Sequence, residues 1–343
     1  MVHEDGELSG NAAKNSSGKS ITLIEAINQA LHYEMRADKA VILLGEDIGI
    51  NGGVFRATSG LFEKFGANRV LDTPLAESMI AGLAIGMATQ GLKPVAEFQF
   101  MGFSYPALDQ IINHAARFRN RTRGRLHCPL VFRMPYGAGI HAPEHHSEST
   151  EAIFAHIPGL RVVIPSSPAR AYGLLLAAIR DPDPVIFLEP TRLYRLNKQA
   201  VPDTGEALPL DHSFLLREGN DITLISWGAM LHETLAAAES LVKKGLSADV
   251  IDVATLKPLD CHNLLRSVEK TGRCVIIHEA ARFCGVGAEI AAQLSEKAFL
   301  SLKAPIQRVT GYDVTVPYAQ LEKQYLPSLT KIINVIDQTV EFV

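Results

Sequence analysis

The stretch AVILLGED, residues 40–47, is the feature that decides the expected fold. Its first part, 40–44, is an unbroken apolar run, which is typical of a strand buried on both faces of a parallel sheet. The run ends at Gly45, and Glu46 and Asp47 then place two carboxylates after the strand. Open α/β sheets bind their ligands at the carboxyl ends of their strands. We therefore expect a parallel α/β fold with a site beyond this strand.

Short apolar runs alternate with helical patterns along the rest of the chain. The first series predicts strands at 70–72, 94–98, 129–134, 161–164 and 185–188, and helices at 21–35, 77–90, 104–121 and 168–180. The second series predicts strands at 222–226, 248–253, 274–278 and 306–310, and helices at 230–244, 260–271, 285–298 and 328–341. This alternation predicts an α/β protein of two domains, each a mainly parallel sheet flanked by helices.

The boundaries between these parts follow from local composition. Residues 196–211 lose periodicity and contain Pro202, Gly205 and Pro209, as an interdomain linker does. We expect the first domain at 20–195 and the second at 212–343. Residues 1–19 are polar and have little to bury, so they are expected to form a disordered tail.

Composition limits the classes of function. The chain has 343 residues, 47% of them hydrophobic, which suffices for about two domains. The net charge of -4 comes from interspersed acids and bases, so no nucleic-acid partner is expected. No run approaches the ~18 consecutive apolar residues of a membrane helix, so no membrane association is expected. The acidic start is unlike a mitochondrial presequence, which favours a bacterial or archaeal cytoplasm.

The segment DTPLAE, residues 72–77, leads from a short strand into a helix rich in small residues. Glu77 stands at the first turn of this helix. One interpretation is a favourable charge at the positive end of the helix dipole. The other is a carboxylate in an apolar setting that shares a proton with a ring nitrogen. The local sequence leaves both interpretations open.

An aromatic segment and a histidine-rich loop follow the next two predicted strands. In EFQFMGF, residues 97–103, the aromatic rings could pack in the core or form a wall for a flat heterocycle oriented by Gln99. In GAGIHAPEHHS, residues 137–147, His141 and His145 have the spacing of a helical zinc pair. Pro143 and the glycines favour a loop instead. Acid–base catalysis, metal binding and incidental surface histidines remain the alternatives for this loop.

Six motifs occur in one order along the chain: LGED (44–47), GGVF (52–55), DTPLAE (72–77), EFQFMGF (97–103), HHSES (145–149) and PGLRVVIPSSP (158–168). Together they closely resemble the β subunit of the E1 component of 2-oxo acid dehydrogenase complexes. The resemblance extends over about residues 20–343 and includes RDPDPVIFLEPTRLYR (180–195), TGRCVIIHEA (271–280) and RVTGYD (308–313).

This resemblance implies a transketolase-like pyrimidine-binding domain followed by a transketolase C-terminal domain, in an α2β2 heterotetramer. In this family thiamine diphosphate binds between the α and β subunits. The α subunit holds the diphosphate and Mg2+ through a Gly-Asp-Gly motif, and the β subunit holds the aminopyrimidine ring. The present sequence contains no Gly-Asp-Gly. We therefore expect a β subunit that is inactive without its α partner.

The resemblance also implies roles for residues around the pyrimidine ring. Glu77 matches the carboxylate that bonds the ring nitrogen and drives deprotonation of the thiazolium carbon. Leu75 is expected to approach the ring through its backbone. Gln99 and Phe103 resemble the residues that flank it.

Further residues are implied outside the ring contacts. His146 matches a loop histidine that assists decarboxylation or acyl transfer to lipoyl-lysine, and the adjacent His145 leaves the division of roles open. Glu46 is expected near the cofactor, and Glu46 and Asp109 could belong to acidic groups linking two active sites.

A structural potassium site is also implied by the resemblance. A hard cation with oxygen ligands suits backbone carbonyls. The expected ligands are Leu130, Ala178, Ile179, Asp181 and Asp183, the last standing where many relatives carry Asn.

The expected reaction is oxidative decarboxylation of pyruvate, with acyl transfer to the lipoyl domain of the E2 dihydrolipoyl acyltransferase. A branched-chain substrate such as 2-oxoisovalerate, and acetoin cleavage, are alternatives within the family. A non-catalytic scaffold subunit is the alternative from another class.

Overall fold

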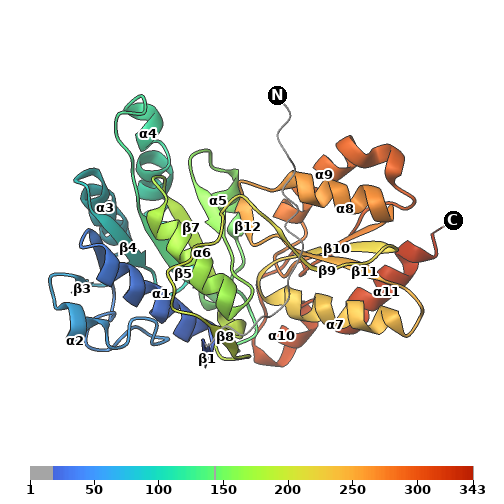
Figure 1. Cartoon of the computed structure of the whole chain (residues 1–343), viewed down its shortest axis with the longest axis horizontal. Coiled ribbons are helices and arrows are strands. Elements are labelled where there is room, and N and C mark those ends of the chain that lie inside the picture. Colours follow the sequence, from blue (N-terminus) through green and yellow to red (C-terminus); the bar gives the residue numbers. More distant parts are fainter. Residues whose placement is uncertain (1–17, 143, 343) are drawn as a thin grey trace.

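The computed structural model describes residues 18–142 and 144–342, and Figure 1 shows them as two α/β units side by side along the long axis. Within these residues the strands form a larger sheet of seven strands, a second sheet of five, and a two-stranded ribbon. The predicted fold class is confirmed. Nearly all of the expected tail lies outside the described residues, and Lys19 already belongs to strand β1 (Lys19–Ile21).

The larger sheet has the order β12-β6-β7-β5-β4-β2-β3. Its neighbouring strands are parallel except for the antiparallel pair β12 and β6. Its strands are β2 (Val41–Gly45), β3 (Val70–Asp72), β4 (Lys93–Glu97), β5 (Val131–Tyr136), β6 (Arg161–Val163), β7 (Val185–Pro190) and β12 (Thr255–Lys257).

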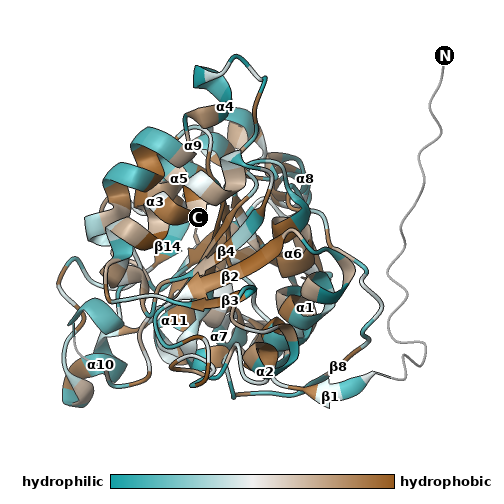
Figure 2. Cartoon of the chain, turned by 90° about the vertical axis from the view of Figure 1, so that its left-hand side faces the viewer, coloured by the Kyte–Doolittle hydropathy of each residue, from teal (hydrophilic) through white to brown (hydrophobic). Residues whose placement is uncertain are grey.

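Strand β2 is buried on both faces, as its apolar run predicts. Val41 and Leu43 face one core with helices α1 (Leu23–Ala37) and α6 (Pro168–Arg180), whereas Leu44 faces the other with α3 (Glu77–Thr89). Side chains alternate between the faces of a strand, so one apolar run supplies both cores. Figure 2 shows these apolar strands between the two helical layers.

Two predicted helices of the first domain need correction. The helix expected from residue 21 begins at Leu23, because Thr22 caps it with Glu25 in a reciprocal capping box. The helix expected at 104–121 is divided, with Pro106 inside its first piece, where proline supplies no backbone donor. The pieces are η1 (Met101–Ala107), η2 (Gln110–Ala115) and α4 (Phe118–Arg121).

The second sheet has the order β14-β13-β10-β11-β9 and is parallel except at β9. Its strands are β9 (Phe214–Arg217), β10 (Ile222–Ser226), β11 (Ala248–Asp252), β13 (Cys274–Ile277) and β14 (Gln307–Val309). Its helices are α7 (Leu231–Val242), α8 (Cys261–Thr271), α9 (Val286–Ala298), α10 (Ala319–Tyr325) and α11 (Leu329–Val340).

Several short elements were not predicted from the sequence, since each is formed by long-range pairing or by a single turn. They are β8 (Gln199–Val201), which pairs with β1, helices α2 (Leu61–Phe65) and α5 (Glu151–His156), and the turns η3 (Glu144–His146), η4 (Thr191–Leu193), η5 (Gly228–Met230) and η6 (Phe299–Ser301).

The two units are joined through β12, which comes from the second half of the chain but pairs with β6 of the larger sheet. The amide of Ile164 also donates to the carbonyl of Ala254 at 2.7 Å.

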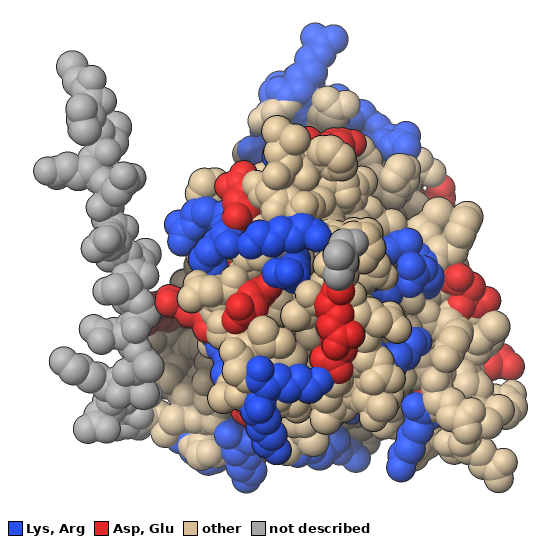
Figure 3. Space-filling model, turned by 90° about the vertical axis from the view of Figure 1, so that its right-hand side faces the viewer, with Lys and Arg blue, Asp and Glu red and all other residues tan. Residues whose placement is uncertain are grey.

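Charged side chains of both signs occur together on the face shown in Figure 3. Among the described residues, no helix is long and apolar enough to cross a membrane.

Candidate functional site

The carboxyl ends of three parallel strands meet at one edge of the larger sheet. In the sheet register, Gly45 at the end of β2 is level with Asp72 of β3 and with Glu97 of β4. Glu46 therefore leaves β2 between these two acids. This is the location at which the sequence predicts a site.

The loop after β2 folds back over this edge. The amide of Gly49 donates to Oδ1 of Asp72 at 2.6 Å, and the hydroxyl of Thr58 donates to the carbonyl of Ile48 at 2.7 Å. Gly53 has a φ of 80°, and a Cβ there would lie 3.1 Å from Oε1 of Glu97. Glycine is thus required where the GGVF motif passes over the end of β4.

Glu77 is half-buried and begins α3. The preceding Ala76 gives this helix no side-chain cap, so its first amides can attract a negative group. The hydroxyl of Ser78 donates to the carbonyl of Pro106 at 2.6 Å, which fixes the start of α3 against η1. Leu75, just before the helix, is 71% exposed.

Glu46 and Glu77 are close enough to interact electrostatically. Burial raises the pKa of the Glu46 carboxyl, and the charges of Asp47 and Glu77 raise this pKa further. Two of the predicted site residues, 31 positions apart in the sequence, are therefore brought to one place. Adjacent carboxyls of this kind favour retention of a proton between them.

His146 lies in an aromatic cluster that follows β4. Its ring is edge-on to Phe100 and to Phe103, with centroid separations of 4.6 and 5.0 Å. Phe55 of the GGVF motif extends the cluster, since it packs against Phe100 at 5.5 Å and Tyr194 at 5.0 Å. The structure thus joins Phe103 and His146, which the sequence predicts separately.

The loop that carries His146 is named here the histidine loop and comprises residues 137–142 and 144–150. The amide of Gly137 donates to the carbonyl of Glu148 at 3.0 Å, which closes its base. Gly102 of η1 is packed so tightly beneath it that a Cβ would lie 2.3 Å from the carbonyl oxygen of His145. Position 102 therefore has to be glycine for the loop to reach this place.

The remaining predicted residues are less closely associated with these groups. Gln99 is half-buried between buried Phe98 and Phe100. Asp109 is exposed and accepts a hydrogen bond from Asn113 on its own segment at 2.6 Å.

The metal interpretation of the histidine loop finds no support in its local geometry. His141 Nδ1 lies 2.5 Å from Glu322, and His145 Nδ1 lies 3.9 Å from Glu144. No group of three or more metal-binding side chains occurs in the part of the chain that the structure describes.

A buried ionic network beneath the site was missed from the sequence. Arg133 of β5 donates to Glu97 at 2.7 Å and to both carboxylate oxygens of Glu189 at 2.7 and 3.0 Å, and Tyr194 donates to Glu189 at 2.6 Å. Burial raises the pKa of Glu97, although the Arg133 charge opposes this shift. The network connects the ends of β4, β5 and β7. Charged residues inside apolar strands were the available signal.

A second cluster of buried acids, between the two units, was also missed. Burial raises the pKa of Glu151 to about 8 and that of Glu279 to about 7. Trp227 donates to Glu151 at 3.2 Å and stacks on His278 at a centroid distance of 5.0 Å. Burial lowers the pKa of His278 to about 3, so this imidazole is neutral at physiological pH.

The residues predicted to hold potassium surround the start of β5 and the end of α6. The carbonyl of Leu130 accepts from Val185 at 3.0 Å, and that of Ala178 accepts from Asp181 at 3.4 Å. A carbonyl oxygen has two lone pairs, so each could still coordinate a hard cation. Carbonyl oxygens are suitable ligands for a potassium ion.

The two acidic side chains of this set are turned towards arginines. Asp181 lies 2.9 Å from Arg161, and Asp183 lies 2.6 Å from Arg119. Any contribution of these residues to a cation site would therefore come from their backbone carbonyls.

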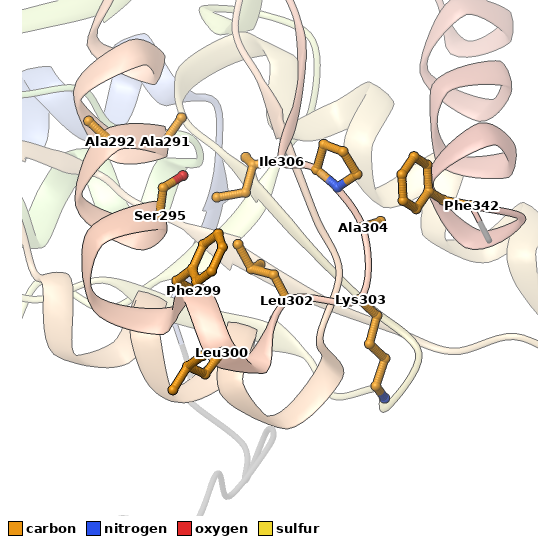
Figure 4. Close-up of a pocket in the computed structure, with 11 residues that line it drawn as sticks. Ala291, Ala292, Ser295, Phe299, Leu300, Leu302, Lys303, Ala304, Ile306 and Phe342 are labelled. Atoms are coloured by element: carbon orange, nitrogen blue, oxygen red, sulfur yellow. The ribbon is translucent and has the colours of Figure 1, made fainter.

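An apolar groove of about 780 Å³ lies elsewhere, between α9 and the C-terminal end of the chain (Figure 4). Phe299, Leu302, Ile306 and Phe342 line it, and none of the predicted site residues does. The described residues that line it include no Asp, Glu or His side chain.

Two family models match the chain. Residues 19–197 match the transketolase pyrimidine-binding domain, and residues 212–332 match the transketolase C-terminal domain. Among solved structures, one titled a split-gene transketolase, inactive β4 tetramer, aligns with a TM-score of 0.78 over 94% of this chain and 99% of its own, at 22% identity. A transketolase from Campylobacter jejuni aligns with a TM-score of 0.68 over 94% of this chain and 47% of its own, at 15% identity. These structures support the fold.

Sequence relatives are much more similar. Pyruvate dehydrogenase E1 component subunits β from Staphylococcus epidermidis and Bacillus subtilis are 49% and 46% identical, over 94% of this chain and 99% of theirs. The corresponding subunit from Acholeplasma laidlawii is 48% identical over 91% of this chain and 95% of its own. The chain therefore belongs to the family of E1 component β subunits, which is built from transketolase pyrimidine-binding and C-terminal domains.

Proposed function

We propose that this chain is the β subunit of a pyruvate dehydrogenase E1, which decarboxylates pyruvate oxidatively and passes the acyl group to the lipoyl domain of an E2 dihydrolipoyl acyltransferase. The family assignment fits the use of thiamine diphosphate. The observation that carries the proposal is the placement of Glu77 at the start of α3, half-buried and beside Glu46, at the carboxyl edge of the sheet.

The proposed cofactor site is shared with an E1 α subunit, which would hold the diphosphate and Mg2+. When bound, thiamine diphosphate supplies a thiazolium carbon that adds to the 2-oxo group and accepts the electrons of decarboxylation. Glu77 would hold a proton at the pyrimidine ring nitrogen, and the backbone at Leu75 would bond the same ring. Gln99 and Phe103 would orient the ring. Glu46 would place a second carboxyl near Glu77.

The surface of α3 supports a partner chain at this edge. Leu75, Met79 and Leu83 are 71%, 42% and 41% exposed, although they are large apolar side chains on the site-forming segment. Exposed apolar patches of this kind are typical of surfaces covered by another subunit. An α subunit packed here would complete the site and exclude water from it.

His146 is proposed to act after decarboxylation, during acyl transfer to lipoyl-lysine. Its contacts with Phe100 and Phe103 hold the imidazole edge-on at the site, and an imidazole can give and take protons near neutral pH. His145 is exposed, and its ring lies beside Glu144 instead of these aromatic rings. These contacts favour His146 for the catalytic role.

Two finer proposals accompany this function. A potassium ion held by the carbonyls of Leu130, Ala178, Ile179, Asp181 and Asp183 would connect β5 with the end of α6. The chain would work in a bacterial cytoplasm, in an α2β2 assembly bound to E2.

Substrate choice is tested with the assembled enzyme. The chain is co-expressed with an α chain that contains Gly-Asp-Gly, and initial rates are measured on pyruvate, 2-oxoisovalerate and acetoin. The proposal predicts the highest kcat/KM on pyruvate. A higher value on 2-oxoisovalerate or acetoin would assign the chain to the corresponding alternative, and inactivity on all three with thiamine diphosphate bound would favour a scaffold role.

A further inference from the structure

Helix α10 of the second domain contacts the histidine loop of the first. Glu322 of α10 is 1% exposed, and one of its carboxylate oxygens accepts hydrogen bonds from the amides of Gly139 at 2.7 Å and His141 at 3.3 Å. Nδ1 of His141 lies 2.5 Å from the other oxygen. A buried carboxylate is costly to desolvate unless it has such partners, so this contact defines one position of the loop.

A second contact holds the other side of the loop. Tyr318, the residue that precedes α10, donates its hydroxyl to Oε1 of Glu144 at 3.3 Å. Figure 2 shows α10 at the lower edge of the molecule, projecting beyond the larger sheet. Helix α10 and the residue before it thus contact the histidine loop at Gly139 and His141 and again at Glu144.

The backbone of the loop requires such support. His141 and Glu144 have φ values of 62° and 43°, in the left-handed region that disfavours residues with a Cβ. Such a residue is strained and persists only where neighbouring contacts enforce its conformation. His141 is the residue that Glu322 of α10 contacts, and Glu144 is the residue that Tyr318 contacts just before the helix.

The loop transmits this constraint to His146. The hydroxyl of Ser147 donates to the carbonyl of Ala142 at 2.6 Å, and the amide of Ser147 donates to the carbonyl of Glu144 at 2.9 Å. The residue after His146 is therefore bonded to both regions held by α10. The His146 ring then meets Phe103 at 5.0 Å.

We propose that Glu322 is a positioning residue for His146, through which the second domain sets where the imidazole stands. Glu322 touches the loop backbone and His141 and is not itself a catalytic residue. This inference rests on the proposed function, because it assigns the regulation of His146 within the same site.

The kinetic test uses the assembled enzyme and compares two half-reactions: decarboxylation with an artificial electron acceptor, and acyl transfer to a free lipoyl domain. Glu322→Ala is expected to lower the kcat of transfer about tenfold, an effect of about 1.4 kcal/mol, with decarboxylation changed less than about twofold. Glu322→Gln keeps an oxygen acceptor and should retain more transfer than Glu322→Ala. Gln324→Ala, at an exposed position on the same helix, is the control and should behave as the parent enzyme.

A double variant separates positioning from general damage. If Glu322 acts through His146, the transfer rate of Glu322→Ala combined with His146→Ala should equal that of His146→Ala alone. Multiplicative losses in the double variant would overturn the proposal.

Hydrogen exchange of the Gly139 and His141 amides gives a readout that does not depend on activity. Loss of their acceptor in Glu322→Ala should speed exchange at both amides by on the order of tenfold. The exchange rates of amides in the strands of the larger sheet should stay unchanged. Unchanged exchange would overturn the positioning role. If His146→Ala itself transfers acyl groups normally while this exchange rises, the proposed function of His146 fails and the hold by Glu322 stands.

Discussion

Glu46 and Glu77 lie within electrostatic range of one another at the carboxyl edge of the larger sheet. The pKa of Glu46 is raised by burial and further by the Asp47 and Glu77 charges. Glu46 comes from the end of β2 and Glu77 from the start of α3, so the pair depends on the parallel register of the sheet. The chemical proposal for this chain follows from that relationship.

Replacing Glu77 by Gln should abolish activation of the cofactor in the assembled enzyme. The amide keeps the size of the side chain but cannot transfer the proton, and such transfer contributes about 10²- to 10⁴-fold in rate. We expect kcat to decrease by a factor within this range, while thiamine diphosphate still binds. Glu63→Gln, at an exposed position of α2, is the matched control. Near-normal turnover of Glu77→Gln would refute the assigned role.

Replacing His146 by Ala should affect the two half-reactions unequally. The imidazole lies against Phe103, where we propose that it transfers protons, so its loss is expected to slow acyl transfer about 10²-fold or more, with decarboxylation retained. An assay with a free lipoyl domain measures acyl transfer, and an assay with an artificial electron acceptor measures decarboxylation. His145→Ala is the comparison and should change transfer much less. Equal losses in both half-reactions would contradict this division.

Gly102→Ala should disturb the histidine loop. The added methyl would lie 2.3 Å from the His145 carbonyl, a backbone atom that can move only with the loop. We expect a destabilisation of about 1–3 kcal/mol and slower acyl transfer. Gly86→Ala is the control, because nothing lies within 4 Å of its Cβ position and alanine favours a helix. Equal unfolding midpoints for the two variants in urea would count against this packing.

The stability of the chain should depend on pH through Glu279. Burial raises the pKa of this carboxyl from 4.5 to about 7, with Arg192 opposing the shift, so the folded state holds the proton more tightly than the unfolded state. Its contribution is fully present below about pH 4.5 and is lost as the pH rises through about 7, at about 1.4 kcal/mol per unit of pKa difference.

Glu279→Gln removes this titration. Urea unfolding at pH 5, 6, 7 and 8 should show the free energy of unfolding of Glu279→Gln rising relative to that of the parent as the pH increases. Glu296→Gln, at an exposed position, should give a curve parallel to the parent. A parallel curve for Glu279→Gln as well would mean that this carboxyl does not titrate as described.

Much of the fold could be predicted from the sequence because its strands are short apolar runs. Residues 40–44, 70–72 and 185–188 each gave a strand within two residues of the observed bounds. Strand β12 could not be predicted in this way. Its pairing with β6 joins residues more than 90 positions apart, and no local pattern records such a contact.

The candidate site could also be predicted only in part. Glu46 was predicted from its place after a buried strand. The predictions of Glu77 and His146 depended on the order of the motifs. The buried pairing of Arg133 with Glu189 and the hold of Glu322 on the histidine loop could not be predicted, because each joins segments distant in sequence. Only the assembled sheets bring them into contact.

We propose that this chain supplies half of an active site and that the α chain supplies the other half. The direct test is the rate of pyruvate decarboxylation, at saturating thiamine diphosphate and Mg2+, by this chain alone, by the α chain alone, and by mixtures of the two. We expect no activity for either chain alone and a rate that rises until the two are equimolar. A rate for this chain alone that matches that of the mixture would show that the site does not need the α chain.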